Sequence, residues 1–133
     1  MVDAMIYDPR WSTIGISFGV LGKLLGANMN TTADQAIPMT ATNYLVTAIY
    51  VTNASTSMTL AVGGIYPAAS KAGTAVVGAG QAYSALTGDA VVLPLTLAVT
   101  STRLTVTPLY LSLTVAQGSA ATADVYVVGV VFG

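Results

Sequence analysis

The chain has 133 residues, of which 54% are hydrophobic and 7% are charged, and its formal net charge is −1. Typical soluble domains carry about 25% charged residues, so the composition predicts one domain that assembles with other subunits. The four Lys and Arg residues form no basic stripe, which argues against direct binding of nucleic acid. The chain has no Cys and no His, which excludes disulfides, thiolate nucleophiles, the usual zinc sites and His-based catalysis.

The first 39 residues mix glycines with apolar residues and keep neither the helical nor the strand period for long. The stretch GVLGKLLGAN could form a short helix with Leu21, Leu24 and Leu25 on one side, ended by Gly26 and Asn28. We therefore expect residues 1–39 to form a partly irregular N-terminal arm, and residues 40–133 to form the folded domain. The arm packs either on another chain or on its own domain, and the pattern leaves both open.

From residue 43 onward the pattern indicates strands. NYLVTAIYVTNAS is rich in β-branched and aromatic residues and closes on a turn. SMTLAVGG alternates, with Met58, Leu60 and Val62 on one face, and Gly63-Gly64 marks a turn or bulge. Pro94 in VVLPLTLAV predicts an edge strand or a bulge.

The last third contains two further strands. In RLTVTPLYLSLTV the apolar positions shift at Pro108, after which Leu109, Leu111, Leu113 and Val115 share one face. Such a shift predicts a bulge or a crossing between sheets at Thr107-Pro108. In DVYVVGVVF both faces are apolar, because Tyr126, Val128, Val130 and Phe132 alternate with Val125, Val127 and Val131. We expect a neighbouring subunit or the arm to cover the first set.

Six to eight short strands with regular turn signals predict an all-β fold, an antiparallel β-sandwich of the jelly-roll kind. A membrane-spanning helix is disfavoured because the longest apolar window, residues 11–27, contains Lys23 and four glycines. Asp3 and Asp8 stand where a signal peptide would be basic. A transmembrane barrel is disfavoured by the unpatterned first third.

No catalytic constellation is visible in the sequence. The five aspartates are scattered, and Asp34 and Asp89 sit in turn-like contexts. GAGQAYS lacks the third glycine and the following helix of a dinucleotide loop. We therefore expect no enzyme activity, no cofactor and no metal site.

Residues 30–132 resemble small β-rich proteins encoded among the virion genes of tailed bacteriophages and prophages. The resemblance lies in NTTADQAIPM, VTNAS, GGIY, YSALT and LYLSLTVAQGSAATADVYV, while the first 29 residues match nothing in that family. It implies a structural virion protein, most directly a capsid decoration or cement protein that binds the major capsid protein as a homotrimer. Such a protein would be made in the host cytoplasm and carried on the capsid surface.

Under this reading the chain contacts itself and the capsid through apolar residues of the arm and of the last strand. The expected contact residues are Trp11, Ile14, Ile16, Phe18, Leu21, Leu24, Leu25, Tyr126, Val128, Val130 and Phe132. The alternative is a receptor- or glycan-binding module of a head or tail fibre, using the loops SKAGTAVVGAGQ and AQGSAATA. Those loops are nearly free of aromatic and charged residues, which is a poor composition for sugar binding.

Overall fold

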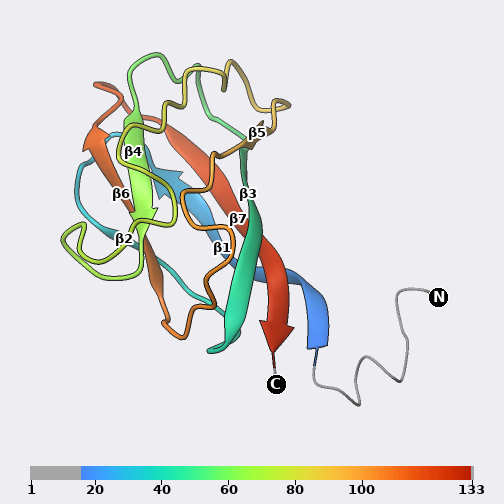
Figure 1. Ribbon diagram of the computed structural model, residues 1–133. Coiled ribbons are helices and arrows are strands. Elements are labelled where there is room, and N and C mark those ends of the chain that lie inside the picture. The colour runs from blue at the N-terminus through green and yellow to red at the C-terminus, as the bar shows by residue number, and fades with distance from the viewer. Residues whose placement is uncertain (1–15, 133) are drawn as a thin grey trace.

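A computed structural model describes residues 16–132, which form two antiparallel sheets and no helix (Figure 1). The first sheet has the order β1-β7-β3-β5 and the second the order β2-β6-β4. Their bounds are Ile16–Asn28 for β1, Gln35–Ile37 for β2, Tyr44–Thr52 for β3, Val62–Tyr66 for β4, Leu93–Pro94 for β5, Leu109–Val115 for β6 and Thr122–Phe132 for β7. This confirms the all-β sandwich, while its jelly-roll variant stays a prediction. Within residues 16–132, no helix could cross a bilayer.

Strand β1 replaces the short helix that we expected around Leu21–Leu25. It pairs antiparallel with β7, from Ile16 opposite Phe132 to Asn28 opposite Thr122. The glycines of this stretch weaken a helix by about 1 kcal/mol each, whereas a strand tolerates them at bulges. The register shifts between Val20 and Gly22, and again between Leu24 and Ala27, where Gly26 takes a positive φ of 65°.

The second half of the expected arm also belongs to the sandwich. Strand β2 pairs with β6, with Gln35 opposite Leu111 and Ile37 opposite Leu109. Residues 16–28 and 35–37 therefore pair with strands of their own domain, and a boundary at residue 39 does not separate them from it. Residues 1–15 lie outside the described part of the chain.

The core fills the space between the sheets. On β7, Val125 and Val127 are fully buried and alternate with half-buried residues, as the period of a strand requires. Opposite them, Leu109, Leu111 and Leu113 of β6 are also fully buried. The expected alternation of β6 is confirmed up to Leu113, but Val115 is 47% exposed.

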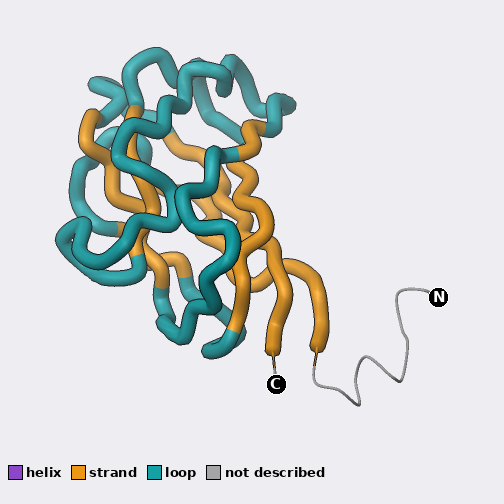
Figure 2. The backbone as a smooth tube through the Cα atoms, viewed as in Figure 1, coloured by secondary structure: helices purple, strands orange, loops and turns teal. Residues whose placement is uncertain are grey.

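Two side edges of the sandwich are closed by short bridges. Along one, Gly22 of β1 bridges Met39, and the Thr40 amide donates to the Leu21 carbonyl at 2.7 Å. Along the other, the long loop after β5 connects to both sheets. Leu104 bridges Tyr44 of β3, and Leu97 bridges Val77, which in turn bridges Ile65 of β4. Figure 2 shows how much of this second side is built from loops.

Three predictions about strands and their irregularities had different outcomes. Residues 57–61 form no strand, and Leu60 is 56% exposed whereas Met58 and Ala61 are buried, so the expected alternation is wrong there. Gly63 does lie at a bulge, because the register of β4 against β6 shifts between Val62 and Gly63. Pro94 lies in the two-residue strand β5 at the edge of its sheet, as predicted.

Candidate interaction surface

The outer face of the β1-β7-β3 sheet is apolar on all three strands. Antiparallel residues that stand opposite one another share a face. Val130 stands between Phe18 of β1 and Leu45 of β3, and Val128 stands between Val20 and Ala48. We call these six residues, with Tyr50, Tyr126 and Phe132, the outer face.

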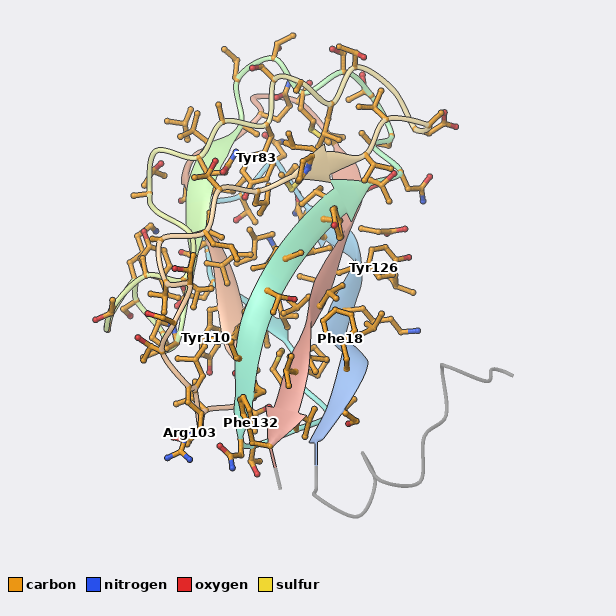
Figure 3. All side chains as sticks on the ribbon, turned by 45° about the vertical axis from the view of Figure 1, so that its right-hand side comes forward. Phe18, Tyr83, Arg103, Tyr110, Tyr126 and Phe132 are labelled. Atoms are coloured by element: carbon orange, nitrogen blue, oxygen red, sulfur yellow. The ribbon has the colours of Figure 1, made fainter. Side chains whose placement is uncertain are left out.

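Exposure on the outer face rises from the centre to the β1 edge. Phe18 is 69% exposed and Val20 is 57% exposed, whereas Tyr126, Val128, Val130 and Phe132 are half-buried by their neighbours on β1 and β3. Figure 3 labels Phe18, Tyr126 and Phe132 along this sheet. A single chain therefore leaves an apolar sheet face in contact with water, and its cover by another chain or by the arm stays a prediction.

The other expected contact residues differ in their surroundings. Leu21 is 2% exposed and belongs to the core, so its prediction as a contact residue is wrong, because it follows the outward-facing Val20 and the alternation of the strand points it inward. Leu24 is partly buried against the core, and Leu25 is 55% exposed. Ile16 pairs with Phe132 at the end of the sheet. Trp11 and Ile14 lie outside the described residues.

Val20, Leu45, Ala48 and Tyr50 of the outer face did not emerge from the sequence. On β3 the register against β7 shifts between Val46 and Ala48. This bulge places Leu45 and Ala48 on one face despite their odd spacing, while Val46, Ile49 and Val51 point into the core. The only sequence signal is the NYLVTAIYVTNAS run itself, which identifies a strand but not the bulge.

A hollow of about 520 Å³ adjoins the outer face at the middle of β1. Val20 and Lys23 of β1, Tyr126 of β7 and Met39 of the following segment are among its lining residues. Lys23 is exposed and pairs across the sheet with Tyr126. The hollow thus combines apolar walls with one cation and one phenol, the kind of site that accepts an aromatic side chain.

A second hollow, of about 480 Å³, lies between the loops around Gly80 and Thr96. Its lining consists of Gly78, Gly80, Gln81, Ala82, Thr96, Leu97 and Ala98. It includes part of the loop that a glycan-binding module would use, and no lining residue is aromatic or charged. Sugar sites depend on aromatic stacking and converging polar groups, so this hollow does not favour that alternative.

Two of the described aspartates, Asp34 and Asp124, accept hydrogen bonds from residues distant in sequence. The Ser70 amide donates to Asp34 Oδ2 at 2.7 Å, and the buried Ser112 hydroxyl donates to Oδ1 at 2.8 Å. These bonds, with a smaller contribution from Lys71, lower the pKa of Asp34 below its ordinary value. Asp124 accepts from the Gly26 amide at 2.7 Å and from Asn53 Nδ2 at 3.0 Å.

The buried side chain of Gln117 makes four hydrogen bonds. Its Oε1 accepts from the amides of Leu60 and Ala61 at 2.9 and 3.1 Å. Its Nε2 donates to the Ser57 carbonyl at 3.3 Å and to Thr59 Oγ1 at 3.0 Å. The Gln117 amide thus provides hydrogen-bond partners for two amides and one carbonyl of the 57–61 segment, which has no strand partner.

Two buried tyrosines also donate to backbone carbonyls. Tyr44 donates to the Val106 carbonyl at 2.6 Å, and burial raises the pKa of Tyr44 to about 12. Tyr83 donates to the Gly63 carbonyl at 3.1 Å, and burial raises its pKa as well. Within residues 16–132, no group of three His, Cys, Asp or Glu side chains could hold a metal ion.

No protein-family model, curated protein or solved structure matches the chain. The outer face is therefore the feature from which a function must be argued.

Proposed function

We propose that this chain is a non-enzymatic structural protein of a tailed-bacteriophage virion, a capsid decoration protein that binds the major capsid protein as a homotrimer on the capsid surface. The observation that carries the proposal is the outer face, an apolar surface of three strands on a chain with only 7% charged residues. The resemblance of residues 30–132 to small virion proteins is the reason for proposing a phage particle as its place of action.

The area of the outer face limits how strongly one subunit can bind to the capsid. Three strands about 4.8 Å apart and seven residues long give a footprint of about 300 Å². Covering it at about 25 cal/mol per Å² contributes on the order of 7 kcal/mol. Association costs on the order of 4–15 kcal/mol, so one such contact is weak. Many copies on a repeating shell would bind firmly, because each bound subunit raises the effective concentration of the next contact.

The copy number per particle tests the proposal. Quantitative mass spectrometry of purified virions should find the chain in hundreds of copies, as a decorated shell requires. About a dozen copies would instead point to a tail, fibre or connector part, and absence from virions would overturn the proposal.

The surface can be tested by adding purified protein back to particles that lack it. Val20→Lys places a charge on the outer face, and Val115→Lys places the same charge on an exposed valine of the second sheet. We expect Val20→Lys to lose particle binding and Val115→Lys to retain it. Equal binding by both variants would remove the outer face from the mechanism.

A further inference from the structure

We propose that residues 67–75 form a latched strap across the second sheet, which opens as one unit when the Asp34 carboxylate takes up a proton, while the sandwich stays folded. The strap follows β4 of the second sheet, so this inference does not depend on the outer face or on the proposed virion role.

The strap reaches from one edge strand of the second sheet to the other. It begins directly after β4, and its tip is bound beside β2, because the Ser70 amide donates to Asp34 Oδ2 at 2.7 Å and Asp34 directly precedes β2. The central strand β6 joins the same carboxylate, because the Ser112 hydroxyl donates to Oδ1 at 2.8 Å. In Figure 1 the strap is the yellow-green loop beside β2.

The latch lies on the side of the second sheet that faces away from the core. Leu111 and Leu113 point into the core, so Ser112 between them points the other way. Ser112 is nevertheless fully buried, beneath the carboxylate that holds the strap. Opening of the strap would therefore uncover Ser112 and give a partner access to this side of the sheet.

The strap itself is held weakly apart from the latch. The Ala72 amide donates to the Ala69 carbonyl at 3.3 Å, which is long for a backbone hydrogen bond. Ser70 and Lys71 have φ values of 61° and 56°, in the left-handed region that strains residues with a side chain. Such a conformation persists only where the surroundings hold it, and the Ser70 amide is the group that Asp34 holds.

The base of the strap is firmly paired, so opening can stop there. The Val76 amide donates to the Ile65 carbonyl at 2.8 Å, and the Ile65 amide donates to the Val77 carbonyl at 3.0 Å. Both ends of the strap are thus fixed to β4 while its tip depends on Asp34.

Protonation releases the latch because both bonds go to an ionised acceptor, and such bonds are roughly twice as strong as neutral ones. Lys71 of the strap adds an attractive charge, β2 has no titratable residue, and β6 and β4 add only the phenols Tyr110 and Tyr66. The two hydrogen bonds and Lys71 lower the pKa of Asp34. The latch is therefore complete above about pH 4 and is lost as pH falls through the lower pKa of the folded state.

Hydrogen exchange measured by NMR on the full chain tests the strap amide by amide. At neutral pH, Asp34→Asn should speed the exchange of the Ser70 and Ala72 amides about tenfold and leave Val76 at the base within about twofold of the parent. An unchanged Ala72 amide would mean that the strap does not open as a unit, and equal acceleration at Val76 would mean general loosening. Either result overturns the proposal.

The pH dependence identifies the latch. In the parent, the protection of Ser70 and Ala72 relative to an unstructured peptide should fall below about pH 4 and meet that of Asp34→Asn, whose protection should stay constant. Asp89→Asn changes an exposed loop aspartate and should match the parent throughout. A strap that stays protected after the Asp34 carboxyl has titrated, as its own carbon-13 signal reports, would exclude Asp34 as the latch.

Discussion

Replacing Gly129 by alanine should disrupt the centre of the first sheet. A Cβ at this position of β7 would overlap the carbonyl oxygen of Leu45 on β3 and approach Leu21 Cδ1 to 2.8 Å. The carbonyl belongs to the backbone, so no rotamer change can relieve the overlap, and β3 and β7 would have to separate. We expect a loss at the upper end of overpacking, about 3 kcal/mol.

Gly19→Ala is the matched control. Gly19 stands directly opposite Gly129 on β1, and a Cβ there would meet no atom within 4 Å. The change should be neutral or stabilising by up to about 1 kcal/mol, since alanine restricts the unfolded chain.

Thermal unfolding followed by circular dichroism compares the two variants. With an unfolding entropy of about 2.1 cal/mol/K per residue, 3 kcal/mol in this chain corresponds to a Tm lowered by about 10 °C. A Gly129→Ala protein within about 2 °C of the parent would refute the close approach of β3 and β7.

The remaining predictions concern the polar groups that fasten the loops. Gln117→Ala leaves the Leu60 and Ala61 amides without their acceptor. It should lower the free energy of unfolding, measured in urea, by about 3 kcal/mol, and an unchanged urea midpoint would contradict this. Asp34→Asn should lower stability at neutral pH. Because the pKa of Asp34 is lowered in the fold, the difference from the parent should begin to shrink near about pH 4 and be lost as pH falls through the lower pKa of the folded state. A difference that persists at still lower pH would contradict a stabilising role for the Asp34 hydrogen bonds. Because the pKa of Tyr44 is raised to about 12, the parent should lose stability as pH rises above about 10, and Tyr44→Phe should lose less over that range. Tyr83→Phe removes one bond to the Gly63 carbonyl and should cost about 1 kcal/mol, with little effect on secondary structure.

The strands with regular alternation could be predicted from the sequence. In DVYVVGVVF a period of two separates Val125 and Val127, which are buried, from Tyr126 and Val128, which are half-buried. Its pairing with β1 and β3 covers the two edges of β7, whereas its apolar outer face stays in contact with water in the single chain. Pro94 likewise identified an edge because proline lacks the amide that a central strand needs.

The features that were missed depend on partners distant in sequence. β1 has a spacing of leucines that suits a short helix, and only its pairing with β7, about a hundred residues later, makes it a strand. The bulge in β3 changes which residues face outward, and no local pattern announces it. Gln117 looks like an ordinary loop residue until the fold surrounds it with the 57–61 segment.

The strand orders also determine when the protein can fold. Among the strands of residues 16–132, β7 alone joins β1 to β3, and β6 alone joins β2 to β4. Both sheets are therefore held together by β6 and β7, which follow the other described strands in the chain. The earlier strands emerge with apolar residues and no lasting partner, so folding must wait until residues 109–132 are synthesised. A chain released before β7 should have neither the first sheet nor the core that it covers.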